Sequence, residues 1–212
     1  MLTTSLLLAT LPNLVEPNFQ SSPQQTEAPS AFSYSFVQAG FTRTDIDGFD
    51  DEADGLSFQV SHSVAPQVFL FGGVGFSAVG VYIVDLGSGQ IIGEDDLETT
   101  TISGGVGFHH PVGPQTDFVA DLAIASVDID VDAIGFSDST TIWAVEAGIR
   151  HLLDPKVEVN AAASLQDGSE IDSQFGAALG ARFYATPKVS IGAGLGVFDD
   201  STSIGLSVRF QW

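Results

Sequence analysis

The last ten residues, 203–212, constrain the fold of this chain more than any other stretch. Apolar and polar residues alternate there without a break, and the apolar set is Ile204, Leu206, Val208, Phe210 and Trp212. A period of two indicates a strand with one apolar and one polar face. A terminal indole suits a lipid–water boundary, because the Trp ring lies well at the level of the headgroups. This strand is therefore predicted to face lipid on its apolar side.

The composition agrees with a membrane protein built from strands. Only 16% of the 212 residues are charged, against about 25% in a typical soluble domain. Glycine is abundant, with 23 residues, and the net charge is −21, which excludes nucleic acid as a partner. The chain has no cysteine, so disulfide scaffolds and cysteine metal sites are excluded. No apolar run reaches the roughly 18 residues of a membrane helix, so a span has to be made of strands.

The N-terminal region differs from the rest of the chain. Residues 1–15 contain an apolar stretch like the hydrophobic region of a signal peptide, but they lack basic residues and a cleavage site. We expect a signal peptide shortened at its start, with an N-terminus without regular structure as the alternative. Residues 16–31 are rich in Pro, Gln and Ser and are predicted to be a disordered linker. Residues 32–212 are predicted to form one barrel domain.

From residue 32 onward, the pattern predicts ten strands joined by two alternating kinds of connection. The strands are expected at 32–43, 56–64, 68–82, 98–110, 116–127, 140–152, 157–166, 173–184, 188–198 and 203–212. One kind of connection is short and contains proline, which presets φ for a tight turn. The other kind lacks proline and carries most of the 27 acidic residues.

This alternation predicts the topology. An even number of strands places both termini on one side, and outer-membrane barrels have short periplasmic turns and longer external loops. We therefore expect an all-β fold: a closed antiparallel up-and-down transmembrane β-barrel of about ten strands, with eight as the alternative. The proline turns and both barrel termini are expected in the periplasm, and the acidic loops outside.

The polar faces of the strands distinguish a membrane barrel from a soluble one. In strand 188–198, Ser190, Gly192, Gly194 and Gly196 oppose an apolar set that includes Ile191 and Leu195. The exterior of a soluble barrel would carry many charges, whereas a face of Gly and Ser suits a narrow lumen. The bulky residues are therefore predicted to contact lipid.

Aromatic residues near the strand ends predict two girdles at the two interfaces. Phe69 is one of these that can point inward. Toward the proline turns lie Phe32, Tyr34, Phe69, Phe108, Phe118, Phe183, Phe210 and Trp212, and toward the acidic loops lie Phe41, Phe58, Trp143 and Phe175.

The terminal strand carries a family resemblance. Leu206, Val208, Phe210 and Trp212 resemble the C-terminal assembly signal of Gram-negative outer-membrane proteins. The barrel region resembles the small outer-membrane β-barrel superfamily, which includes OmpA-like, OmpX-like and porin-like small barrels. The resemblance implies the bacterial outer membrane, with lipid bilayer, lipopolysaccharide and the barrel assembly machinery as partners. Ten strands instead of eight, and a final Trp instead of Phe, depart from the pattern. We expect a monomer.

Strand parity predicts which ionisable residues face the lumen. They are Asp117, Asp121, Glu146, Glu158, Arg150, Arg182 and Arg209. Buried charges must pair or be hydrated. One interpretation is a salt-bridge network that fills and stiffens a narrow barrel. The other is a charge constriction in a narrow pore, with Glu146 as its central carboxylate.

One acidic loop has the composition of a weak cation site. Asp45, Asp47, Asp50, Asp51 and Glu52 lie close together, and Ca²⁺ or Mg²⁺ binds several carboxylate oxygens. The spacing does not fit an EF-hand, and a solvated loop is the alternative. Weak Ca²⁺ or Mg²⁺ binding could bridge this loop to lipopolysaccharide phosphates. No other metal or cofactor is expected.

The sequence does not favour an enzyme. The four histidines, His62, His109, His110 and His151, all lie near proline turns, and successive residues such as His109 and His110 face opposite sides of a strand. Two functions remain. The first is a structural or surface-interaction barrel acting through its acidic loops, and the second is a narrow channel for small, preferably cationic solutes. Side chains still fill the interior of a barrel of about this size, which favours the first.

Overall fold

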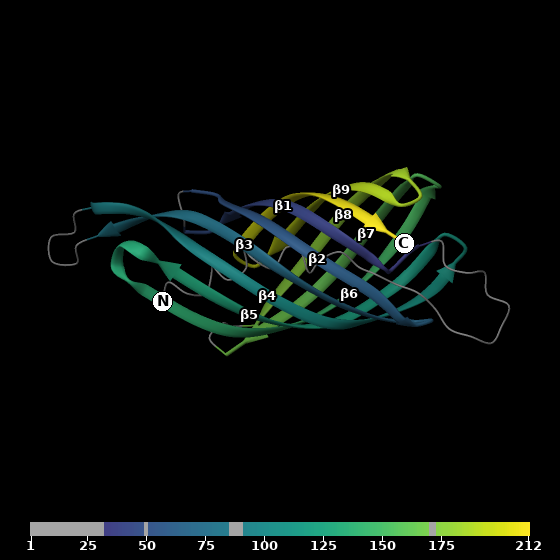
Figure 1. Ribbon diagram of the computed structural model, residues 1–212, viewed down its shortest axis with the longest axis horizontal. Helices are drawn as coiled ribbons and strands as arrows, with labels where there is room; N and C mark the ends of the chain where they lie inside the picture. The colour runs from purple at the N-terminus through teal and green to yellow at the C-terminus, as the bar shows by residue number, and fades with distance from the viewer. Residues whose placement is uncertain (1–31, 49–50, 85–90, 170–172) are drawn as a thin grey trace.

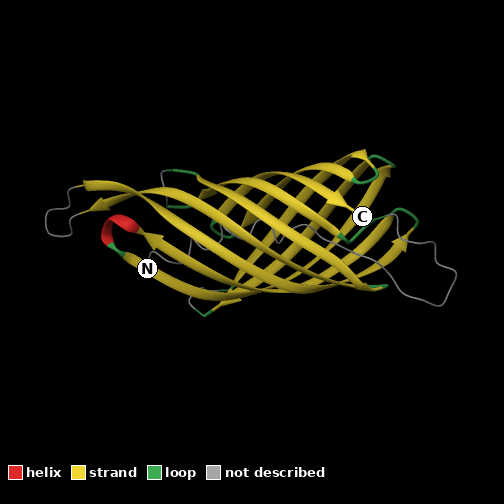
Figure 2. Cartoon of the chain, viewed as in Figure 1, coloured by secondary structure: helices red, strands yellow, loops and turns green. Residues whose placement is uncertain are grey.

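A computed structural model describes residues 32–48, 51–84, 91–169 and 173–212, and within them ten antiparallel strands close into a barrel (Figures 1 and 2). The fold prediction is confirmed, with ten strands rather than eight. The strands are β1 (Phe36–Ile46), β2 (Ala53–Ala65), β3 (Val68–Val84), β4 (Ile91–Gly113), β5 (Thr116–Val131), β6 (Phe136–Asp154), β7 (Val157–Gly168), β8 (Gln174–Thr186), β9 (Val189–Phe198) and β10 (Ser201–Gln211). A 3-10 turn, η2 (Asp132–Ile134), links β5 to β6. Among these residues no helix is long and apolar enough to cross a membrane.

At one end of the barrel, four hairpins have the same kind of two-residue turn, a proline followed by Gln or Lys. The turns are Pro66-Gln67, Pro114-Gln115, Pro155-Lys156 and Pro187-Lys188. Each hairpin has an irregularity in register beside its turn. In each case, the carbonyl of the second turn residue accepts a hydrogen bond from a backbone amide of another strand. For example, the His109 amide donates to the Gln67 carbonyl at 3.0 Å. We call this the proline-turn end and the opposite end the acidic end.

The wall of the barrel is uneven at the acidic end. Strands β3 to β6 have 16 to 23 residues, whereas β7 to β10 have 10 to 13. The β3–β4 and β5–β6 hairpins therefore extend past the other strands (Figure 1). Two stretches predicted as acidic loops are partly strand, because Asp95 and Asp96 lie in β4 while Asp128 and Asp130 lie in β5. The predicted loop at 199–202 is a two-residue turn.

The outward face is apolar, as predicted. Leu206 and Val208 on β10 are 61% and 55% exposed, whereas Ser207 between them is 9% exposed. The same parity holds on β9, where Ile191 and Leu195 are exposed and Ser190 is buried. Bulky side chains thus cover the outside of the barrel, and small or polar ones line the lumen.

The first strand begins four residues later than predicted. Phe32–Ser35 do not join the sheet. The ladder between β1 and β10 ends at the pair Phe36–Gln211, and beyond it the Trp212 amide still donates to the Ser35 carbonyl. Phe32, Tyr34 and Phe69 are buried at the proline-turn end and pack together with Val119, Leu152 and Tyr184. These three aromatics therefore belong to the interior, not to an interfacial girdle.

The other predicted girdle residues are exposed on the outside of the barrel: Phe108, Phe118, Phe183, Phe210 and Trp212 at the proline-turn end, and Phe41, Phe58, Trp143 and Phe175 toward the acidic end. The predicted signal peptide at 1–15 and linker at 16–31 lie outside the described residues.

Candidate functional site

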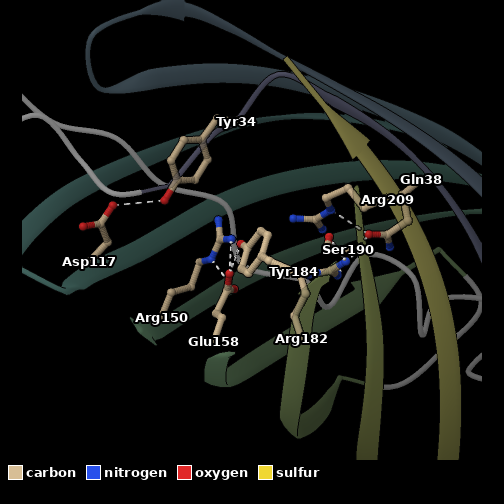
Figure 3. A network of polar contacts seen from close by, with 9 residues as sticks. All are labelled: Tyr34, Gln38, Asp117, Arg150, Glu158, Arg182, Tyr184, Ser190 and Arg209. Atoms are coloured by element: carbon tan, nitrogen blue, oxygen red, sulfur yellow. Dashed lines mark hydrogen bonds and ion pairs between the residues drawn. The ribbon is translucent and has the colours of Figure 1, made fainter. Parts of the chain in front are cut away.

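The lumen holds all seven ionisable residues that strand parity predicted. Each is buried, and the most exposed of them, Asp121, reaches only 9%. They enter from β5 to β8 and from β10, and most lie nearer the proline-turn end. Figure 3 shows that Arg150, Arg182 and Arg209 turn toward side chains from other strands.

The closest pair joins β6 to β7. The Nε of Arg150 donates to Oε1 of Glu158 at 2.7 Å, and its Nη2 donates to Oε2 at 2.8 Å. The hydroxyl of Tyr184 also donates to Glu158. Two parallel hydrogen bonds fix both side chains, and such bidentate pairs are the strongest kind of ion pair. Both partners are almost fully buried.

A second group forms around Gln38 of β1. Its Oε1 accepts from Nε of Arg209 at 2.8 Å and from Nη2 of Arg182 at 3.1 Å. Arg182 also donates to Ser190, and the guanidinium of Arg209 lies 3.8 Å from the centre of the Phe36 ring. One neutral amide thus positions two arginines that lie on different strands.

Two carboxylates lie side by side on the part of the wall across the lumen from Gln38. Asp121 of β5 and Glu146 of β6 are direct partners in the ladder, and both point inward. Nearer the proline-turn end, Asp117 accepts a hydrogen bond from the Tyr34 hydroxyl at 3.0 Å. The lumen therefore has carboxylates on β5 and β6 and arginines on β8 and β10, and the Arg150–Glu158 pair joins β6 to β7 between them.

Sequence reasoning missed the neutral members of these groups. Tyr34, Tyr184 and Ser190 each bond to one of the charged residues, and Gln38 bonds to two. Parity placed Ser190 on the lumen face and would have placed Gln38 and Tyr184 there as well. Nothing in the local pattern says that Gln38 meets both arginines.

The interior around Glu146 is packed. Glu146 is 3% exposed, so water barely reaches the carboxylate that would define a pore constriction. A cavity of about 60 Å³ lies instead against β7 to β10 and β1, next to Gln38, Thr42, Asn160, Gly194 and Ser207. A space of this size holds a few water molecules, and Glu146 is not among its lining residues.

Aliphatic side chains fill the lumen toward the acidic end. Ala125, Val127, Ile129 and Ile142 form one buried cluster, and Ile46, Ala53 and Val79 form another. Leu97 packs against both clusters. This layer spans the inner faces of β1 to β6, where the buried threonines Thr44, Thr99, Thr101 and Thr140 lie among the aliphatic side chains.

The predicted cation loop is only partly described. Asp45, Asp47, Asp51 and Glu52 are exposed, and Asp50 lies outside the described residues. Glu52 lies 3.4 Å from Arg43, which also pairs with Asp54 at 2.7 Å. Within the described parts of the chain, no three acidic or histidine side chains are grouped closely enough to hold a metal ion. Of the adjacent histidines, His109 is buried in the lumen and His110 lies on the outer face, so they point apart as predicted.

Comparison with known families decides what kind of barrel this is. The model of the outer membrane protein beta-barrel domain matches residues 18–183. The chain belongs to that family. The match ends within β8. Strands β9 and β10 of this outer-membrane barrel lie beyond the matched residues, and β10 closes the sheet against β1. The protein is therefore a barrel of the bacterial outer membrane. No curated protein matches it.

Solved structures show the same fold at low sequence identity. The β-domain of the Bordetella autotransporter BrkA aligns with a TM-score of 0.55 and 9% identity, over 85% of this chain and 99% of that one. The NanC porin aligns with a TM-score of 0.51 and 9% identity, over 83% of this chain and 100% of that one. These likenesses concern the fold alone. The family and these neighbours are outer-membrane barrels rather than enzymes.

Proposed function

We propose that this outer-membrane barrel has a structural and surface-interaction role, and neither conducts solutes nor catalyses a reaction. The observation that carries this proposal is the burial of the lumen charges, with Glu146 at 3% and Arg150 and Glu158 at 1% exposure. In a water-filled pore these groups would be hydrated. Here Arg150 and Glu158 pair with each other, and Tyr184 also donates to Glu158, which favours a network that stiffens the barrel.

The orientation in the membrane follows from the two ends. We place the proline turns and both barrel termini in the periplasm and the acidic end outside. The two-residue turns at one end and the extended β3–β6 hairpins at the other support this orientation, since external loops are the longer ones in this class of barrel. The outward-facing C-terminal set, Leu206, Val208, Phe210 and Trp212, would be the segment that the barrel assembly machinery recognises.

The extended part of the sheet is the proposed interaction element. On its outer face, an open groove is lined by Thr100, Asp128, Asp130, Ser137, Asp138 and Ser139. On the β6 edge, Phe136–Thr140 have no ladder partner in β7 among the described residues, and the Ser169 amide donates to the carbonyl of the next residue, Thr141. Unpaired strand edges accept an added strand, and the carboxylates favour a cationic partner. Divalent ions bridging to lipopolysaccharide phosphates are a second way to use the same charges.

Planar-bilayer recording tests the closed barrel. The detergent-folded protein should give no steady conductance steps, and the Glu146→Ala variant should be equally silent, because Glu146 does not line an open path. Ion-selective steps that change in Glu146→Ala would replace this proposal with the channel alternative. A heat-modifiable gel shift verifies that each sample is folded.

A second measurement tests the acidic surface. Thermal stability in lipopolysaccharide micelles should rise on adding Mg²⁺ and fall again on adding EDTA. The Asp128→Asn/Asp130→Asn variant should lose most of this rise, whereas Ser137→Ala in the same groove should keep it. An equal Mg²⁺ effect in both variants would remove these aspartates from the interaction.

A further inference from the structure

The mouth at the proline-turn end is covered by the four residues before β1, Phe32–Ser35, which we call the seal. The ladders of β1 with β2 and β10 both begin at Phe36. The seal is thus not part of the sheet, yet Phe32 is 3% and Tyr34 1% exposed. A segment outside the sheet that is this well buried has its side chains inside the barrel.

Tyr34 reaches across the mouth. Its ring stacks on His109 of β4, with centroids 4.5 Å apart and planes 16° from parallel, and it lies 5.9 Å from the ring of Phe69. Its hydroxyl donates to Asp117 of β5 at 3.0 Å (Figure 3). The side chain therefore connects the β1 side of the mouth to β3, β4 and β5.

The aromatic rings cover the ion pair. The guanidinium carbon of Arg150 lies 4.5 Å from the ring centre of Phe32 and 5.1 Å from that of Tyr34. Arg150 and Glu158 project from β6 and β7 a few residues from the Pro155-Lys156 turn, but each is only 1% exposed. Rings over the guanidinium keep water from a pair that otherwise lies close to the mouth.

The backbone of the seal is held at a few points. Ser61 Oγ donates to the Tyr34 carbonyl at 2.9 Å, and the Trp212 amide donates to the Ser35 carbonyl at 3.1 Å. Ser33 Oγ donates to the Trp212 carbonyl at 3.0 Å. Residues 32–35 belong to none of the residue pairs in the ladders of β1 with β2 and β10. The seal can therefore move while the sheet stays closed.

We propose that Phe32–Ser35 is a displaceable lid on the proline-turn mouth. In place, it excludes water from the Arg150–Glu158 layer, and when displaced, it admits small solutes to that layer without opening the sheet. This inference goes beyond the proposed function, because it concerns access to the lumen from one end only. The aliphatic layer at the acidic end is independent of the seal.

A single engineered thiol tests the proposal. The chain has no cysteine, and Ser190 faces the lumen with 0% exposure, so Ser190→Cys introduces one buried reporter. In the full-length, detergent-folded protein, this thiol should react slowly with a charged methanethiosulfonate reagent. Adding Phe32→Ala and Tyr34→Ala should raise the rate about tenfold or more, because local opening then exposes the site. The heat-modifiable gel shift should remain.

The matched control removes an aromatic ring at the same end but on the lipid side. Phe210→Ala should leave the thiol as protected as in the parent. Equal protection with and without the two seal rings would overturn the proposal, as would an equal increase in Phe210→Ala, which would indicate general loosening. Should the double variant fail to fold, Phe32→Ala alone keeps the Tyr34–Asp117 bond and must show an increase of the same sign.

Discussion

The two ends of the lumen are filled in different ways. At the proline-turn end, the Arg150–Glu158 pair and aromatic rings fill the space, and at the acidic end, aliphatic chains such as Val127 and Ile142 do so. A buried ion pair is stable only when both partners are present, because a buried charge without its partner lowers the free energy of unfolding. An aliphatic filling depends on volume and tolerates exchange between similar shapes. The ends should therefore respond differently to mutation.

The largest expected effect is at the ion pair. Glu158→Ala leaves Arg150 buried without its bidentate partner and should reduce the free energy of unfolding by about 3–5 kcal/mol. Urea unfolding in lipid vesicles measures the loss. The double variant Arg150→Met/Glu158→Leu should lose much less, because it removes both charges. A loss below about 1 kcal/mol in Glu158→Ala would contradict a strongly coupled pair.

The aliphatic end should show a cavity effect instead. Ile142 is 1% exposed within its cluster, so Ile142→Ala should cost roughly 2–5 kcal/mol and Ile142→Val about 1 kcal/mol. The matched control is Ile124→Ala, since Ile124 is 60% exposed toward lipid and lipid chains fill the space left there. Equal losses for Ile142→Ala and Ile124→Ala would show that the inner layer is not closely packed.

The smallest expected effect compares two inward glycines. A Cβ at Gly107 of β4 would overlap the Phe69 ring, whereas a Cβ at Gly194 of β9 would lie 3.4 Å from its nearest neighbour, the Leu179 carbonyl. Gly107→Ala should cost about 1–3 kcal/mol through overpacking. Gly194→Ala borders the cavity and should change stability by less than about 1 kcal/mol. The same unfolding measurement checks both, and the reverse order would refute the difference in packing.

The alternation of residues was sufficient to predict the strands and their faces. Leu206 and Val208 face outward and Ser207 inward because successive strand residues point to opposite sides. The seven lumen charges followed from the same rule. The acidic stretches were harder, because Asp95, Asp96, Asp128 and Asp130 lie in strand segments that extend past the apolar belt. There the outward residues are polar and the inward ones, such as Val127 and Ile129, are apolar, so the alternation is inverted relative to the lipid-facing belt.

The start of the barrel also required the structure. Phe32 and Tyr34 continue the spacing of β1, and only the ladder with β10, which ends at the pair Phe36–Gln211, shows that they lie outside the sheet. The contacts of Tyr34 with His109 and Asp117 join residues about 80 positions apart. Local patterns contain no information at such separations.

The sequence by itself determined the membrane barrel, its ten strands and the inward set of charges, because strand geometry turns a period of two directly into two faces. The tertiary structure alone decided that Gln38 binds both Arg182 and Arg209, and that Glu146 lies in a packed interior. These contacts run across the lumen, and they depend on the register and tilt with which all ten strands close.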